Sequence, residues 1–448
     1  MSEKVASKFR NGTWFIIPFW CESYDEIVSY YKSSADWKKT VFESKYLLRY
    51  AERIGKDEEL FCRFVHKGPE TLAVDNYKDT IMYSFLKKTE RQDQRAAFED
   101  FLDRISLASV AVNCFSTGVG FIEFYVEYGD LPIECIIDFH YHFKSRRYHK
   151  KDAERPNLYL LAQQLIPEHL KAELFFYASS EVKHDCICYT GLKLPQSLLR
   201  SEQSKRHLYW MGRSYNTGFI YDEENFSEDI SRYDFRYSPY QADKWSGSQE
   251  ALTNLNYESE DPKQDYFLNN HKYDHLSNDY HFLFLIILNQ RFAAIRYLEQ
   301  IVESREHDSE QIMELNQKIV RLQTVFTLRV ISNDMLCQNV YSRMYDIMDI
   351  DNLMTDLKDN EQQVQILREQ THLMQEREDE AAERKLRWVL AALSLLAVFS
   401  ALVDAAGYLE MFPNYFLPIS ARWTAFIVIV LVCVLVYLMY WGRGKKKK

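Results

Sequence analysis

Short apolar blocks alternate with polar ones as far as residue 277, and their spacing predicts a mixed α/β domain. Three apolar runs predict strands: residues 13–20, 104–114 and 119–128. Three segments predict helices: residues 23–31, 131–143 and 158–176, the last broken at Pro167. Residues 115–118 are turn-like, so we expect a β-hairpin around them. Residues 184–189 predict another strand, and strands with long loops are expected from 201 to 275.

From residue 278 onward the periodicity is helical. Residues 280–302 predict a packed helix, because Arg291 and Arg296 interrupt their apolar character too early for a membrane span. A second helix is predicted by apolar residues at helical spacing: Ile312, Leu315, Ile319, Leu322 and Phe326. A third is expected from about Asn333 into the apolar run at Trp388, because no Gly or Pro lies between Pro262 and Gly407.

The last part of this third helix has a heptad register. One seam position holds Ile350, Leu357, Val364 and Thr371, and the other holds Leu353, Leu367, Met374, Ala381 and Trp388, with Asn360 between them. Two interpretations fit: an amphipathic helix on its own domain, or helices that associate between subunits. We favour a homo-oligomer, because a seam that leads into an apolar run suits a symmetric stalk.

Two apolar runs near the C-terminus, 388–409 and 423–441, are long enough to predict transmembrane helices. Basic residues flank the pair on its outer sides: Arg384, Lys385, Arg387, Arg443 and Lys445 to Lys448. The loop 410–422 between the runs carries Arg422 as its cation. Lys and Arg mark the cytoplasmic side, so we expect a multi-pass protein of the inner (plasma) membrane with both ends in the cytoplasm.

The expected fold class is therefore α+β, with a cytosolic α/β N-terminal domain, a long helical stalk and two C-terminal transmembrane helices. The expected segments are 1–277 (sensor domain, with two subdomains meeting near 150–200 as an option), 278–387 (stalk), 388–409 (first transmembrane helix), 410–422 (external loop), 423–441 (second transmembrane helix) and 442–448 (basic tail). Residues 1–13 are polar, so no signal peptide is expected.

Composition and motifs narrow the function. The chain has 448 residues and a formal net charge of −10, which argues against direct nucleic-acid binding. Its 8 scattered cysteines suit reduced thiols. The sequence has no Gly-rich phosphate loop, no His-Glu-x-x-His zinc helix and no set of nucleophile, base and orienter. We therefore expect a protein that is not an enzyme, without catalytic residues or a metal site.

Two clusters contain the residue types of metal ligands. His184, Cys186 and Cys188 would share one face of a strand, but a second ligand group is missing, so ordinary strand residues are the favoured interpretation. His140 and His142 lie two apart on a predicted helix and do not converge on one ion.

The densest basic run of the N-terminal part is 146–151. Arg146 and Arg147 could grip a phosphate with their guanidinium forks, and Tyr148 could stack on a base. These three are the candidate ligand-binding residues, with a solvated helix end as the plainer alternative. A second, weaker basic candidate consists of Lys205, Arg206, His207, Tyr209, Trp210 and Arg213.

A stripe of small residues ends at the carboxylate of the first apolar run. Ser394, Ala397, Ala401 and Asp404 are spaced three and four apart, so they share one helix face. Small residues allow close helix packing or a pore, and a ring of carboxylates would attract cations. These four are the candidate pore-lining residues. The alternative is that Asp404 is a loop residue at the external interface.

The order of these segments resembles that of the CorA family of magnesium channels, over roughly residues 278–448. The shared features are a cytosolic α/β domain, helices that double back, one long helix entering a first span, and a second span with a basic tail. The family's Gly-Met-Asn signature is absent, because residues 406–414 read Ala-Gly-Tyr-Leu-Glu-Met-Phe-Pro-Asn. The large N-terminal part and the missing signature are similar to a divergent CorA-like subset that accompanies type III CRISPR systems.

The resemblance implies a pentameric membrane effector of antiviral defence. Its cytosolic domain would sense a nucleotide second messenger, such as an adenylated S-adenosylmethionine, and would gate a pore or disrupt the membrane. The implied partners are further copies of the chain, the lipid bilayer and an adenine-nucleotide ligand. Two alternatives stay open: a divergent divalent-cation transporter of the magnesium type, and a membrane-anchored interaction protein without a pore.

Overall fold

The computed structural model divides into two compact units, Met1–Val364 and Gln365–Lys448, which we call unit 1 and unit 2 and describe separately. The structure describes residues 9–411 and Val430, except for 73–74, 88–93, 130, 145–157, 176–185, 200, 221–241 and 304–308. The domain boundary expected at residue 278 falls inside unit 1.

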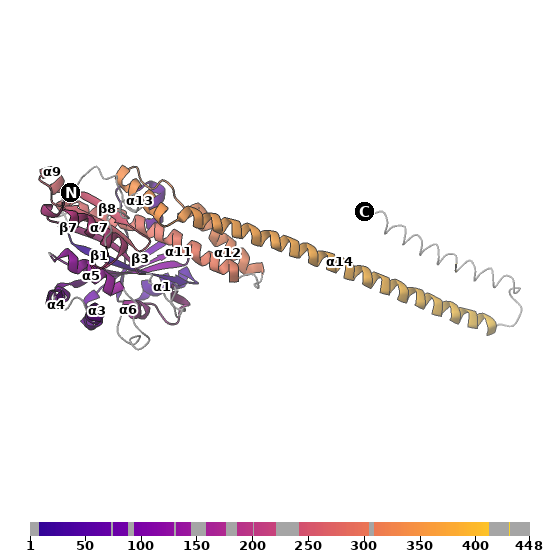
Figure 1. Cartoon of the computed structure of the whole chain (residues 1–448). Coiled ribbons are helices and arrows are strands. Elements are labelled where there is room, and N and C mark those ends of the chain that lie inside the picture. The colour runs from indigo at the N-terminus through magenta and orange to yellow at the C-terminus, as the bar shows by residue number, and fades with distance from the viewer. Residues whose placement is uncertain are drawn as a thin grey trace. The chain divides into compact units, whose positions relative to one another are not determined.

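Unit 1 is built on one nine-stranded sheet (Figure 1). The strands are β1 (Gly12–Cys21), β2 (Trp37–Thr40), β3 (Phe61–His66), β4 (Ser106–Phe115), β5 (Val119–Glu127), β6 (Ala172–Leu174), β7 (Ile187–Leu194), β8 (Asp243–Gly247) and β9 (Ala251–Tyr257). Their order is β2-β3-β4-β5-β1-β7-β9-β8, and β6 also pairs with β1. Neighbours are antiparallel except β7 and β9. The predicted hairpin is confirmed as β4 and β5, whose turn contains Gly118 at a φ of 87°.

The described helices are α1 (Tyr24–Ser33), α2 (Arg49–Lys56), α3 (Asp75–Lys87), α4 (Arg95–Arg104), α5 (Ile133–Lys144), α6 (Leu158–Leu165), α7 (Glu202–Arg213), α9 (Pro262–Asn270), α10 (Lys272–His275), α11 (His281–Glu303), α12 (Ser309–Arg321), α13 (Met335–Ile347) and α14 (Ile350–Met411). Among them, α1, α7, α9 and α13 begin at an N-cap residue whose side chain accepts a backbone N–H. The predicted cap of the first helix is confirmed, because the Ser23 side chain accepts a hydrogen bond from the Glu26 N–H. Two π-helical turns, Leu276–Tyr280 and Leu322–Phe326, join or extend these helices.

Alternate side chains of β1 enter two separate cores. Phe15, Ile17 and Phe19 pack with side chains of α1, α3, α4, α5 and α6 on one face of the sheet. Trp14 and Ile16 pack on the other face with α2, α11, α13 and the start of α14 (Figure 1). The apolar run at 13–20 therefore forms a central strand that is buried on both faces, as its unbroken hydrophobicity predicts.

The helix α11 contributes His281 to a buried polar network on one face of the sheet. His281 Nε2 lies 2.7 Å from Glu123 Oε1, and Arg63 Nη1 lies 2.6 Å from Glu123 Oε2. Burial opposes ionisation of Glu123, but the charges of Arg63 and His281 outweigh it and lower the pKa of Glu123 to about 2. Because an unpaired charge would be costly here, the network fixes α11 against β3 and β5.

Three expectations about the helices are wrong. The predicted helix 158–176 does not resume after Pro167, because α6 ends at Leu165 and Ala172–Leu174 form β6. The third helix is not continuous, because α13 ends at Ile347 and Asp349 adopts a φ of 57° before α14 begins at Ile350. A non-glycine residue in the left-handed region leaves no clear signal in a sequence. The helix α7 forms within the stretch 201–275, where strands and loops were expected.

No helix in the described part of the chain combines the length and the apolar character that a membrane crossing requires. The expected transmembrane helix at 388–409, the fold class that included it and the inner-membrane location are therefore corrected. Asp404 follows Trp388 after only 16 residues, whereas a span needs about 20 apolar ones. Residues 423–441 lie outside the described residues, apart from Val430. The sheet and helices of unit 1 form an α+β fold without these segments.

Candidate functional site

The residues expected to bind a ligand or line a pore are not brought together in a described site. Three lie outside the described residues: Arg146, Arg147 and Tyr148. Four lie on α14, three of them exposed and the last placed only by its backbone: Ser394, Ala397, Ala401 and Asp404. The role in a pore required a membrane span, so it is not carried further.

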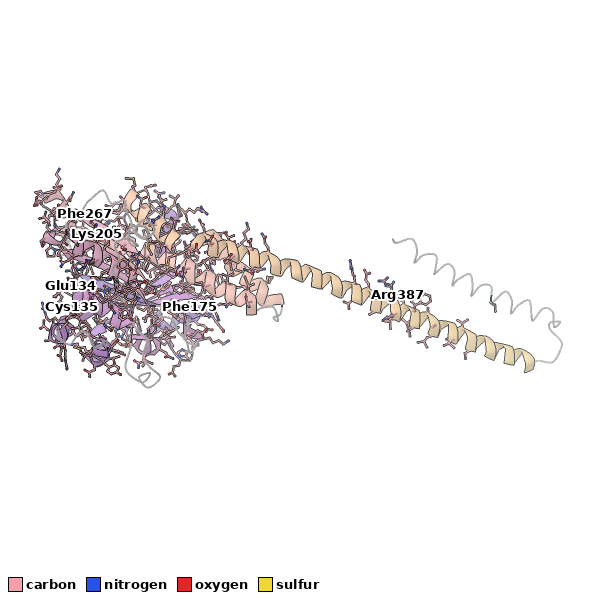
Figure 2. All side chains as sticks on the ribbon, viewed as in Figure 1. Glu134, Cys135, Phe175, Lys205, Phe267 and Arg387 are labelled. Carbon is pink, nitrogen blue, oxygen red and sulfur yellow. The ribbon has the colours of Figure 1, made fainter. Side chains whose placement is uncertain are left out.

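The second basic candidate lies on α7 and is engaged in packing contacts. His207 Nε2 is 3.0 Å from Glu134 Oε1 on α5, and the Arg213 guanidinium lies 4.4 Å from the ring centre of Tyr209 (Glu134 and Lys205 are labelled in Figure 2). The first contact attaches α7 to α5, and the second lies within α7. They explain why the helix carries basic and aromatic residues without invoking a phosphate.

The histidine and cysteine candidates are buried in the sheet core. His140 Nε2 lies 2.7 Å from Thr13 Oγ1, and Cys186 and Cys188 are buried at β7, whereas His184 lies outside the described residues. Across the residues that the structure describes, no three His, Cys, Asp or Glu are grouped so that they could hold a metal ion.

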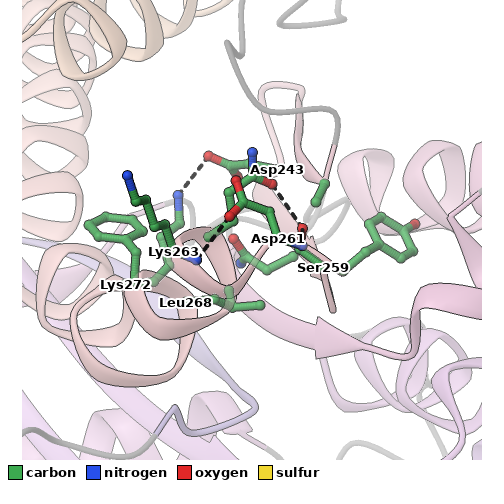
Figure 3. Close-up of a pocket in the computed structure, with 11 residues that line it drawn as sticks. Asp243, Ser259, Asp261, Lys263, Leu268 and Lys272 are labelled. Carbon is green, nitrogen blue, oxygen red and sulfur yellow. Dashed lines mark hydrogen bonds and ion pairs between the residues drawn. The ribbon is translucent and has the colours of Figure 1, made fainter.

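A pocket of about 310 Å³ opens at one edge of the sheet, where the hairpin of β8 and β9 meets α9 (Figure 3). The edge strand β8 pairs with β9 so that Asp243 lies opposite Asn256 at one end of the hairpin. The chain then turns through Ser259 and Asp261 into α9, which with α10 forms the opposite wall. The sequence thus brings polar side chains from two strands and two helices to one place.

The floor of the pocket is a connected polar network. Lys272 Nζ donates to Asp243 Oδ2 at 2.8 Å, and Asn254 Nδ2 donates to Asp243 Oδ1 at 2.5 Å. The Lys272 side chain is only 3% exposed, and its ammonium also lies 5.2 Å from the ring centre of Trp245 and 5.5 Å from that of Tyr280. A buried ammonium depends on such partners, because an uncompensated charge would be costly at this place.

The rim of the pocket is the first two turns of α9. Asp261 caps this helix, because its Oδ1 accepts the Lys263 N–H at 2.9 Å, and Pro262 occupies the first helical position. Lys263 and Phe267 are four residues apart and both line the pocket (Phe267 is labelled in Figure 2). The Lys263 ammonium is exposed and has no ion pair among the described residues, and Phe267 is 40% exposed.

No family model, curated protein or solved structure matches this chain. The resemblance to CorA-like proteins therefore stays a prediction.

The described lining carries two lysines and two aspartates, and one of the lysines has no ion-pair partner among the described residues. Asp243 neutralises Lys272, and the Asp261 carboxylate is engaged at the start of α9, so Lys263 is the free cation of the described lining. A free ammonium beside a partly exposed aromatic ring suits a small anionic molecule with a planar group. Sequence reasoning missed this site because it assigned 201–275 to strands and loops. The available signal was Asp261-Pro262, a helix start that brings Lys263 and Phe267 onto one face.

Proposed function

We propose that unit 1 is a ligand-binding module that recognises a small anionic nucleotide, of the second-messenger type, in the pocket between β8, β9 and α9. The observation that carries this proposal is the ammonium of Lys263, which has no ion-pair partner among the described residues and lies on the same helix as the exposed ring of Phe267, four residues away. Arg146, Arg147 and Tyr148 remain candidate contacts for the same class of ligand.

The phosphate would bind at Lys263. This lysine lies in the first turn of α9, where the helix dipole disfavours a cation. An anionic group there would satisfy the lysine, and it would also interact favourably with the partial positive charge of the helix start. The buried Lys272 adds a second positive charge below it, although Asp243 offsets most of its effect.

The base would stack on Phe267. One side of this ring is held by His275, whose ring centre is 5.7 Å away at an interplanar angle of 27°. A partly exposed ring that is fixed from behind can accept a base at small entropic cost, and stacking of a base on an aromatic side chain contributes about 1–3 kcal/mol. The pocket volume of about 310 Å³ is at the small end for ligand sites, which favours a mononucleotide over a nucleic-acid strand.

Binding is a better interpretation of this lining than catalysis. Ser259 is the one serine of the described lining, and its hydroxyl donates to Gln264 Oε1 at 3.0 Å. The described lining contains no histidine or cysteine, so it holds no serine–histidine or cysteine–histidine pair.

Calorimetric titration of the full chain with ATP tests the proposal, with adenosine as the uncharged comparison. We expect ATP to bind, adenosine to bind more weakly, and Lys263→Ala to weaken ATP binding by about tenfold or more, because it removes the ammonium partner of a phosphate. The matched control is Lys38→Ala, which removes another exposed lysine without an ion pair among the described residues, on β2 at the opposite edge of the sheet.

The control variant should bind ATP as the parent does. The proposal is wrong if the parent binds no nucleotide, or if Lys263→Ala binds ATP as tightly as Lys38→Ala does.

A further inference from the structure

The pocket floor belongs to a continuous helical segment. Lys272 is the first residue of α10, which leads through the π-helical turn Leu276–Tyr280 directly into α11. A continuous run of helical backbone therefore joins Lys272 to the start of α11.

Asp279, within the π-helical turn, holds the loop 43–48. Its Oδ1 accepts hydrogen bonds from Ser44 Oγ at 2.6 Å and from the N–H groups of Lys45 and Tyr46 at 2.8 and 3.2 Å. Its Oδ2 lies 3.2 Å from His275 Nδ1. We call these contacts the Asp279 clasp. Burial opposes ionisation of Asp279, but the hydrogen bonds outweigh it and hold the pKa of this carboxyl below its usual value.

The loop 43–48 in turn holds the segment that precedes α13. The Leu48 N–H donates to the Ile331 carbonyl at 2.9 Å, and Ser332 Oγ donates to the Tyr46 carbonyl at 2.6 Å. Asp334, two residues later, caps α13 with its side chain. Direct contacts therefore connect the pocket floor with the start of α13.

The π-helical turn Leu276–Tyr280 lies between Lys272 and α11, and a change of its helical register would affect both. A π-helical turn holds one residue more than an α-helical turn, and it is uncommon and often marks a functional position. A return to α-helical register rotates the preceding residues by about 100° relative to those that follow. Such a rotation moves Lys272 relative to Asp243 and His275 relative to Asp279 together.

We infer that the Asp243–Lys272 pair in the pocket is coupled to the Asp279 clasp through the π-helical turn, so that a ligand in the pocket regulates how loop 43–48 is held. The role of the ligand rests on the proposed function, whereas the coupling itself is a property of the chain. An anion competes with Asp243 for Lys272, and it shifts the equilibrium by as much as its affinities for the two registers of the turn differ.

Amide hydrogen exchange of the full chain tests the coupling at the two backbone N–H groups that Asp279 accepts, those of Lys45 and Tyr46. We expect Lys272→Met to speed their exchange about tenfold, because the variant keeps the side-chain length but loses the ion pair. The matched control is Lys263→Met, which changes a lysine of the same pocket that makes no ion pair in the described part of the chain. It should leave these amides unchanged.

Amides of the β4–β5 hairpin report general destabilisation, and they should exchange at the parental rate in both variants. If Lys272→Met does not fold, Asp243→Asn removes the same ion pair with little change of shape and decides the matter. The coupling is refuted if the Lys45 and Tyr46 amides exchange at the parental rate in every folded variant that lacks the pair. Bound ATP should also change their exchange, and binding without such a change refutes it equally. If ATP does not bind at all, the proposed function is wrong while the variants still decide the coupling.

Discussion

At the scale of single residues, His140 makes the stability of unit 1 depend on pH. Its Nε2 lies 2.7 Å from Thr13 Oγ1 and 3.0 Å from the Tyr128 hydroxyl. Burial, with a smaller contribution from Lys144, lowers the pKa of His140 from 6.5 to about 3. Below pH 6.5 the unfolded chain takes up a proton that the folded chain refuses, so stability present at neutral pH is lost on acidification. The loss is about 1.4 kcal/mol per pH unit until pH approaches 3.

Urea denaturation at about pH 7 and about pH 5 measures this loss. In His140→Gln, a glutamine that can still donate to Thr13 replaces the histidine. We expect the free energy of unfolding of this variant to fall less between about pH 7 and about pH 5 than that of the parent, because one histidine fewer takes up a proton on unfolding. An unchanged pH dependence in this variant would mean that His140 is not neutral in the folded protein. His281, whose pKa burial also lowers, should keep part of the dependence in the variant.

At the scale of elements, α14 presents apolar side chains that nothing in the described structure covers. Within unit 2, Leu386, Trp388 and Leu396 are 60, 61 and 65% exposed, close to Arg387, which is labelled in Figure 2. The seam predicted from the heptads begins inside unit 1, where Ile350 and Leu357 are already buried against the core. The rest of the seam therefore remains the predicted site of association with further copies of the chain.

Mass photometry of the full chain tests this association. We expect one closed oligomer for the parent and a shift toward monomer for Trp388→Lys, because a lysine ammonium at a seam position is costly to bury. Asp379→Lys introduces the same ammonium at an exposed residue that falls on neither seam position, and this control should keep the parental mass. A monomeric parent would contradict the homo-oligomer.

The elements also show where the sequence is informative. The strand β1 and the helix α11 could be predicted, because an unbroken apolar run indicates an element that is buried on all sides, as β1 and the start of α11 are. The helix α7 could not, because polar side chains occupy its buried face at Ser204 and His207 and hide the helical period. The pocket was missed for the same reason, since Lys272 is a charged residue that the fold buries. A buried ion pair depends on a partner 29 residues away, and periodicity does not reveal such a partner.

At the scale of the whole molecule, one sheet organises unit 1, and the helical segments after residue 278 complete it. The apolar start of α11 covers one face of the sheet. The region that was expected to form a separate stalk therefore packs with the sheet in the core on that face. The apolar C-terminal sequence led to a membrane assignment that the described helices do not support. Unit 1 is a large α+β unit with a polar pocket at the edge of its sheet, and we propose that this pocket binds a nucleotide.

The most direct test of that claim is a hydrogen-exchange footprint of the full chain with and without ATP. We expect protection of amides in β8, in the turn between β9 and α9, and in the first turns of α9, because these segments carry Asp243, Ser259 and Lys263. Adenosine should protect them less, since it lacks the group that Lys263 binds. Protection that is absent, or that is confined to other segments while these three exchange as in the free protein, would contradict the account.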